Sequence, residues 1–287
     1  MAKIVIVDFW DVLDIQQQPF DFRGLMEQIS RLPRTDRMKD RGSHIDYLAE
    51  VSTDNNTASG TAVRARTQDW PGTVNTATGD LGELNLDADT VIGEEMSFHF
   101  DRTLQVLATQ RNLYLRASRF AKLALEIGGA PFEIQPKLRE DAWLRLQRMR
   151  MSWSVEIKVR GPLRHPQFSS SAPSVSRLIQ EASNEVNAIN VDLVLSTGRS
   201  RARGLNANPI RAVADYFRRH TEDLRGLKIK GSRADEEAAE TIDFVKDRLI
   251  FSGEVPYTNN RLDRNQCQRL LRRAINENRQ YLRDLIA

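Results

Sequence analysis

The stretch Val91–Asp101, VIGEEMSFHFD, is the clearest structural signal in the sequence and decides the fold class. Apolar and polar residues alternate strictly along it, which is the pattern of a β-strand with one apolar and one polar face. The apolar face consists of Met96, Phe98 and Phe100, and the polar face of Glu95, Ser97, His99 and Asp101. Residues 103–110 follow as a hairpin partner, so an antiparallel pair is expected here.

Further strands and helices are expected on both sides of this hairpin. Alternation predicts strands at residues 3–9, 42–51, 60–68, 132–135, 153–159, 189–195, 227–230 and 249–255. Helical spacing predicts helices at residues 21–31, 118–127, 136–150, 175–188, 209–220 and 263–286. Residues 69–86 are rich in Gly, Thr, Asp and Asn and should form a long surface loop. The mixture predicts an α+β fold with mixed or antiparallel sheets and flanking helices.

A connection rich in proline and serine at residues 162–173 is the best candidate for a domain boundary. We therefore expect two subdomains. The first is an N-terminal α+β domain at residues 1–165, and the second is a basic α+β domain at residues 174–287 that ends in a long helix.

Location and stabilisation can also be predicted from the sequence. It contains no secretory signal and no run of about 20 apolar residues that could span a bilayer. Its single cysteine, Cys267, excludes an internal disulfide and a thiolate zinc cluster. A soluble, cytoplasmic protein stabilised by packing is expected, with Cys267 acting as a small hydrophobic residue rather than a nucleophile.

Charge is distributed unevenly along the chain. Residues 1–101 contain 9 Lys+Arg and 18 Asp+Glu, whereas residues 102–287 contain 33 and 21. Of the 42 basic residues, 34 are arginine, whose planar guanidinium suits bidentate phosphate contacts. A GC-rich genome gives the same bias, so composition alone does not establish phosphate binding. The acidic first third is a competing partner for the basic part, in the same chain or in another copy.

The loop at residues 196–208 is the first candidate for binding a polyanion. Its arginines, Arg199, Arg201 and Arg203, lie between Gly198 and Gly204 at the end of an apolar strand. Guanidinium groups on a flexible loop can follow a phosphate backbone, and glycines let backbone N–H groups approach it. The alternative is a solvated turn whose arginines pair with nearby carboxylates.

The C-terminal helix is the second candidate. Arg269, Arg272 and Arg273 lie beside a continuous apolar stripe. A basic amphipathic helix can press on nucleic acid, on an acidic partner or on a membrane surface. It can equally be an ordinary core-packing helix with a solvated face.

We expect no metal, no cofactor and no small-molecule substrate.

Catalytic sites have less support, and the sequence favours a non-enzymatic protein. Glu156 and Lys158 form the E-x-K pair of metal-dependent nucleases, with Glu133 and Asp141 upstream. A predicted helix separates Asp141 from Glu156, whereas a nuclease core of this kind needs its two acids on neighbouring strands. On the strand at 91–101, a carboxylate and an imidazole are compatible with a metal, but no second histidine has ligand spacing. An ordinary polar strand face is therefore expected there.

Three stretches between Asp89 and Gly161 carry a family resemblance: DTVIGEEMSFHF, PFEIQPKLREDAWLRLQRMRM and SWSVEIKVRG. Their order resembles a bacterial family related in layout to the phage-exclusion protein RexA and to the KwaB component of the Kiwa antiphage system. The resemblance implies a non-enzymatic, dimeric DNA-binding protein that senses phage replication and signals to a membrane or effector partner encoded nearby. It transfers no individual functional residue.

These observations predict a sequence-nonspecific DNA-binding component of a prokaryotic antiphage defence system, acting as a homodimer. The residues expected to contact phosphates are Arg199, Arg201, Arg203, Arg269, Arg272 and Arg273. RNA is an alternative ligand. A metal-dependent nuclease and a protein-interaction adaptor are the alternative functions.

Overall fold

The computed structural model describes residues 2–69, 72–74, 76–84, 87, 90–160, 175, 177, 181, 190–198, 204–219, 224–232, 240–245, 247–258 and 261–284. The chain divides into two compact units: unit 1 is Met1–Ile134 with Ile250–Ala287, and unit 2 is Gln135–Leu249. These ranges differ from the predicted 1–165 and 174–287. The reason is that β14 (Ile250–Thr258) pairs with β1 (Ala2–Leu13), which returns the end of the chain to the N-terminal sheet. The expected boundary at 162–173 lies outside the described residues.

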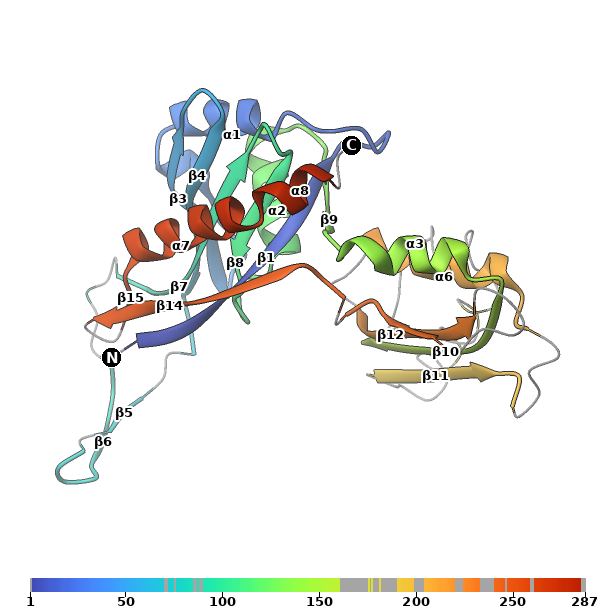
Figure 1. Cartoon of the computed structure of the whole chain (residues 1–287). Coiled ribbons are helices and arrows are strands. Elements are labelled where there is room, and N and C mark those ends of the chain that lie inside the picture. Colours follow the sequence, from blue (N-terminus) through green and yellow to red (C-terminus); the bar gives the residue numbers. More distant parts are fainter. Residues whose placement is uncertain are drawn as a thin grey trace. The chain divides into compact units, whose positions relative to one another are not determined.

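Unit 1 is built on a nine-stranded sheet with the order β15-β14-β1-β8-β7-β4-β3-β2, and β9 pairs with β1 (Figure 1). Its other strands are β2 (Met38–Asp40), β3 (His44–Thr53), β4 (Thr57–Arg66), β7 (Ile92–Asp101), β8 (Val106–Gln110), β9 (Glu133–Pro136) and β15 (Arg261–Leu262). Neighbours along the eight-strand path are antiparallel. Within the expected loop, β5 (Thr73–Val74) and β6 (Leu81–Gly82) form a small pair. The α+β prediction is confirmed.

One face of this sheet carries an aromatic core. Two helices, α1 (Phe22–Arg31) and α2 (Ala117–Gly128), pack over it. Phe98 of β7 is fully buried, and its ring centroid lies 4.7 Å from that of Phe120 and 6.4 Å from that of Phe22. The apolar face predicted from alternation is therefore the core face, and burial of such rings stabilises unit 1 by several kcal/mol.

The ends of α1 and α2 follow the capping signals in the sequence. The Asp21 side chain accepts a hydrogen bond from the Gly24 N–H at 3.2 Å and begins α1. Gly129 ends α2 with a positive φ of 73°, a conformation that glycine adopts without strain. The helices expected at 21–31 and 118–127 are thus confirmed.

The opposite face of the sheet is covered by the C-terminal helices α7 (Arg264–Glu277) and α8 (Arg279–Asp284). Figure 1 shows them in red, crossing in front of the strands, and α7 packs against β7, β8 and β14. At Gly253 of β14 the helix comes so close that an added Cβ would lie 2.3 Å from Leu270 Cδ1. Glycine here lets α7 lie directly on the strand.

Unit 2 has a four-stranded sheet with the order β11-β10-β12-β13, and all its pairs are antiparallel. Its elements are α3 (Glu140–Arg148), β10 (Met151–Arg160), β11 (Asn190–Ser196), α6 (Ala207–Arg219), β12 (Leu224–Ser232) and β13 (Glu240–Asp243). Leu146 and Phe217 from the helices pack with Val155 and Ile157 in one core. The helix expected at 175–188 lies almost entirely outside the described residues.

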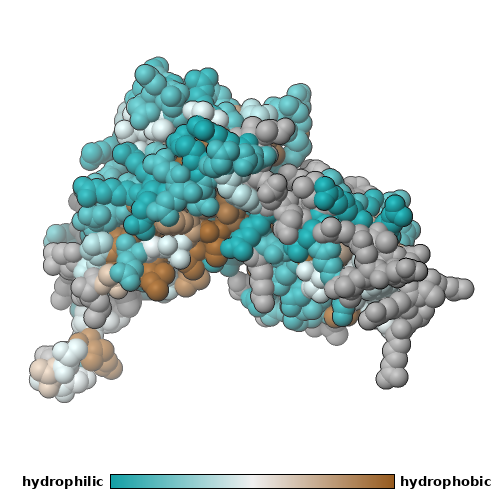
Figure 2. Space-filling view, viewed as in Figure 1, coloured by the Kyte–Doolittle hydropathy of each residue, from teal (hydrophilic) through white to brown (hydrophobic). Residues whose placement is uncertain are grey.

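Figure 2 shows hydrophilic side chains over α7 and a group of hydrophobic ones below it, over β1 and β14. In these strands, Ile4 is 68 % exposed and Ile250 is 39 % exposed. Within the described part of the chain, no helix is both long enough and apolar enough to cross a membrane.

Candidate functional site

The helix α7 carries three of the six predicted phosphate contacts, and its own sequence explains its position. The Asp263 side chain accepts a hydrogen bond from the Gln266 N–H at 2.9 Å and begins the helix. The apolar stripe is buried and consists of Cys267, Leu270, Leu271, Ala274 and Ile275. At Asn278 the helix stops and α8 follows. The long helix expected at 263–286 is therefore two helices.

The arginines on the outer side of α7 are exposed. The side chains of Arg269 and Arg272 form no hydrogen bond or ion pair with any residue that the structure describes. Arg273 is more engaged, since its Nε lies 3.5 Å from a Glu277 carboxylate oxygen and its guanidinium lies 5.5 Å from the centroid of the Phe251 ring. Two of the three predicted helix contacts thus offer a whole guanidinium to a ligand.

Two other arginines hold these helices on the sheet. Arg264 donates from Nε and Nη2 to the two carboxylate oxygens of Glu95 at 2.6 and 2.5 Å, and from Nη1 to Glu50 at 3.2 Å. Arg279 Nη2 donates to Asp101 at 3.0 Å. The hydrogen bonds to Glu95 raise the pKa of Arg264, so its guanidinium remains charged. The acidic first third therefore does meet the basic C-terminal region, within one chain.

The polar face of β7 lies under α7 and is buried. Ser97, His99 and Asp101 are only 3–5 % exposed. Burial, together with the positive charge of Arg272, lowers the pKa of His99 to about 4, so this imidazole is neutral at pH 7. Alternation placed these residues on one face, but it gave no sign that a helix distant in sequence would cover them. Among the described residues, no group of three His, Cys, Asp or Glu side chains could hold a metal ion.

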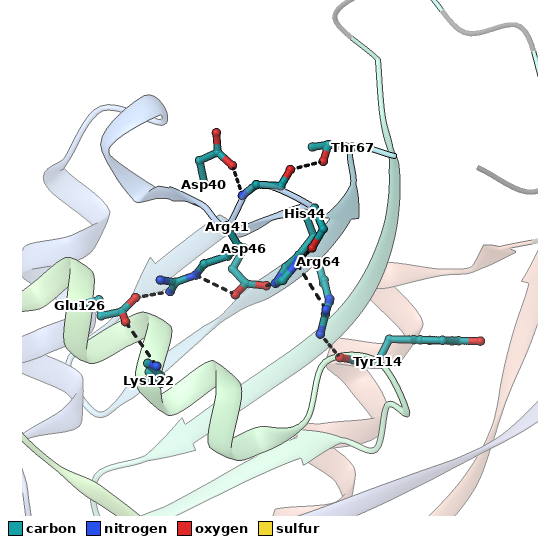
Figure 3. A network of polar contacts seen from close by, with 11 residues as sticks. Asp40, Arg41, His44, Asp46, Arg64, Thr67, Tyr114, Lys122 and Glu126 are labelled. Carbon is teal, nitrogen blue, oxygen red and sulfur yellow. Dashed lines mark hydrogen bonds and ion pairs between the residues drawn. The ribbon is translucent and has the colours of Figure 1, made fainter. Parts of the chain in front are cut away.

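A second polar cluster lies on the opposite face of the sheet and ties α2 to the strands (Figure 3). Arg41 forms ion pairs with Glu126 of α2 and with Asp46 of β3, which is only 2 % exposed. His44 Nε2 lies 3.7 Å from Asp46, and Arg64 Nη2 lies 3.4 Å from His44 Nδ1. His44, isolated in the sequence, thus has charged neighbours in the fold. Because Arg41 is matched by two acids, we assign this cluster a structural role.

The arginine-rich loop can be placed only by its flanks. Arg199, Arg201 and Arg203 lie outside the described residues. The loop follows β11, and Leu205 at its far side donates its N–H to the Ser152 carbonyl at 2.6 Å. These flanks belong to unit 2, whereas α7 belongs to unit 1. The two predicted basic elements are therefore carried by different units.

The E-x-K pair lies on the open face of the unit 2 sheet. Lys158 Nζ lies 3.0 Å from Glu156 and 3.5 Å from Asp192, while Lys228 Nζ lies 3.9 Å from Glu156. The hydrogen bond from Lys158 lowers the pKa of Glu156. Asp141 is in α3, on a helix rather than on a strand next to Glu156. The geometry is that of cross-strand charge pairing, which stabilises a solvated sheet face modestly.

Comparison with known proteins gives a family for this chain. The chain belongs to the family of unknown function DUF6731, whose model matches residues 3–282 and so spans both units. A search of curated proteins gives no match. The family brings no activity with it, so function has to be argued from the residues themselves.

Proposed function

We propose that the outer face of α7 binds the phosphates of nucleic acid without reading the base sequence. The observation that carries this proposal is the contrast between two sets of arginines on the same pair of helices. Arg264 and Arg279 are paired with acids of the sheet, whereas Arg269 and Arg272 are exposed and have no partner among the described residues. Because the helix backbone is already docked on the sheet, binding an anion has to order only the arginine side chains.

The absence of sequence specificity follows from the chemistry of phosphate contacts. Phosphate contacts position a protein on nucleic acid but carry no base information, so DNA and RNA of any sequence should bind. Arg199, Arg201 and Arg203 in unit 2 are a second proposed contact. We place this binding in a cytoplasmic, homodimeric protein. The resemblance to RexA and KwaB implies an antiphage defence system in which the protein signals to a membrane or effector partner.

A salt series of gel shifts tests this proposal with a matched pair of variants. Arg269→Ala/Arg272→Ala removes two charges from α7. The control, Arg31→Ala/Lys122→Ala, removes two charges from the opposite face of the sheet, where both side chains are at least 70 % exposed. Each phosphate contact contributes about 0.9 to the slope of log K against log salt, so the α7 variant should lower the slope by about 1.8.

The control variant should keep the slope of the unmodified protein. Absence of binding at low salt would overturn the proposal, as would equal slopes in the two double variants. Arg199→Ala/Arg201→Ala/Arg203→Ala in the same series measures the contribution of the loop separately.

A further inference from the structure

A groove of about 330 Å³ opens in unit 1 beside α7. Residues from four segments line it: Arg34 and Arg37 from the turn after α1, Ser52 from β3, Ser59 and Gly60 from β4, and Gln268 from α7. Its volume is at the lower end of the range for small-molecule sites. The groove is thus large enough for a phosphorylated sugar.

The groove exists because the strands end and shift at this edge of the sheet. The edge strand β2 pairs only with Ile45–Tyr47 of β3, so the later residues of β3 have no strand beyond them. A register shift between Leu48 and Glu50 marks a bulge. Opposite the bulge, a Cβ on Gly60 would lie 1.9 Å from the Glu50 carbonyl oxygen, so a side chain cannot occupy this position. The recess is therefore built into the backbone.

Two guanidinium groups line the groove. The Arg34 side chain is exposed and forms no hydrogen bond or ion pair within the described part of the chain. Arg37 is held in place, because its Nη2 donates to the carbonyls of Ser30 at 2.6 Å and Leu32 at 2.7 Å and its Nε donates to Leu32 at 3.0 Å, which leaves Nη1 to donate to a ligand. The acid in the lining, Glu50, shares Arg264 with Glu95, so Arg34 and Arg37 together still outnumber the acids of the groove. The positive charge of the groove is therefore available to an anion.

The remaining polar groups of the groove indicate which chemical group is attached to the bound anion. Gln268 Nε2 donates to the Gly60 carbonyl at 2.7 Å, while its Oε1 is buried without a hydrogen-bond partner among the described residues. A buried acceptor of this kind favours a hydroxyl donor. Ser52 and Ser59 add hydroxyl groups, and none of the lining residues is aromatic, so no ring is available for base stacking. The chemistry suits a phosphate with its sugar rather than a base.

We propose that this groove binds a phosphomonoester, as carried by the terminus of a nucleic-acid strand that lies along α7. The inference rests on the proposed function for its source of ligand. A phosphomonoester carries a charge of about −1.5 to −2 at pH 7, and its oxygens can accept hydrogen bonds from the Arg34 guanidinium and from Nη1 of Arg37. Gln268 and Arg272 are four residues apart and therefore share one side of α7, so a strand held by Arg272 can reach the groove with its end.

Fluorescence anisotropy with three oligonucleotides of one sequence tests this inference on the full chain. One has no terminal phosphate, one has a 5′ phosphate and one has a 3′ phosphate. The unmodified protein should bind one of the phosphorylated forms roughly tenfold more tightly, which is the ratio expected for one additional charge-assisted hydrogen bond. Arg34→Glu should abolish this preference and leave binding of the unphosphorylated strand within about twofold.

Arg31→Glu is the matched control, because it makes the same charge change at a side chain that is 73 % exposed on α1. It should keep the preference. Gln268→Glu is the second groove variant; it places an isosteric carboxylate in the lining and should also abolish the preference. Thermal shift with ribose 5-phosphate on the unmodified protein and on Arg34→Glu tests the free sugar phosphate.

The outcomes separate the two proposals. Binding of all three oligonucleotides with equal affinity, together with no thermal shift, overturns the groove and leaves the α7 face intact. A thermal shift that Arg34→Glu removes, without binding of any oligonucleotide, supports the phosphomonoester site, assigns it a small ligand and overturns nucleic-acid binding.

Discussion

The two faces of the unit 1 sheet are built from the same strands by opposite means. Under α1 and α2, Phe98 and its aromatic neighbours form a dry core. Under α7, one residue away along β7, Ser97 and His99 are buried in a polar layer that ion pairs of Arg264 and Arg279 enclose. The aromatic face stabilises unit 1, whereas the polar face positions a charged helix and leaves a groove beside it.

This difference shows where function should be sought in the fold. Polar groups are expensive to bury, so a face that keeps Thr61 Oγ1 and His99 Nδ1 buried without hydrogen-bond partners among the described residues gives up stability. On the side of α1 and α2, Asp46 Oδ1 and Arg119 Nη1 are also buried without such a partner, but both atoms lie outside the aromatic core. We therefore place the ligand-binding role on the side of α7, and the following changes would break or sharpen this contrast.

The largest expected effect comes from adjacent residues of β7 that point to opposite faces. Phe98→Ala should lower the free energy of unfolding by about 4 kcal/mol, because it leaves a cavity among packed rings. Ser97→Ala should lower it by less than about 1 kcal/mol, because it removes a small polar group. Urea denaturation of both variants measures the difference. Similar losses would show that the two faces contribute equally to stability.

A second effect should appear with pH and belongs to the polar face alone. His99 has a pKa of about 4 in the folded chain and about 6.5 when unfolded, so between these values only the unfolded chain binds the proton. Stability is therefore fully present above pH 6.5 and is lost as the pH falls toward 4, by about 2 kcal/mol between pH 7 and pH 5. Arg272, Asp101 and Asp54 are the charged groups that act on this imidazole.

The control for this effect is His99→Gln, which cannot take up the proton. Denaturation of both proteins at the two pH values isolates the contribution of His99, because the carboxylates titrate in both. An unchanged pH dependence in His99→Gln would mean that His99 is not held neutral beneath α7.

The sequence was enough to predict that β7 has one apolar and one polar face, but not which helices cover these faces. Alternation identified Phe98 and His99 as residues of opposite faces, and helical spacing placed Arg269 and Arg272 beside the apolar stripe. Neither pattern indicates which element covers the polar face. That depends on Arg264 meeting Glu95, 169 residues away in sequence. A local periodicity contains no information on such a pairing.

The groove beside α7 could not be predicted from the sequence either, for a different reason. Arg37 lies in a 3₁₀ helix of three residues, Thr35–Arg37, and Arg34 is its N-cap. So short a segment has no hydrophobic period, and nothing in the sequence marks these two arginines as functional. They become a pair at a site only because β2 ends early and the bulge in β3 opens the edge of the sheet. Two arginines near a helix end are, by themselves, ordinary residues of a protein surface.

The smallest expected effect is on the local stability of α7 on the polar face. The rate at which the Cys267 thiol reacts measures this stability. This thiol is 2 % exposed on the buried side of the helix, and burial raises its pKa to about 11, so it should react very slowly with a thiol reagent in the folded protein. Arg264→Ala removes the two hydrogen bonds to Glu95 at the start of the helix. The side chain of Arg264 is 44 % exposed, so solvent screening limits the loss to about 1 kcal/mol.

A loss of this size corresponds to roughly fivefold faster labelling of Cys267, if the helix opens locally before it reacts. Arg283→Ala, in the exposed part of α8, is the matched control and should leave the rate unchanged. If Arg264→Ala accelerates labelling without a comparable fall in global stability, the ion pairs hold α7 as a separate layer on the polar face. Equal changes in both quantities would instead mean that α7 and the aromatic core unfold as one unit, and the two faces would then differ in composition but not in cooperativity.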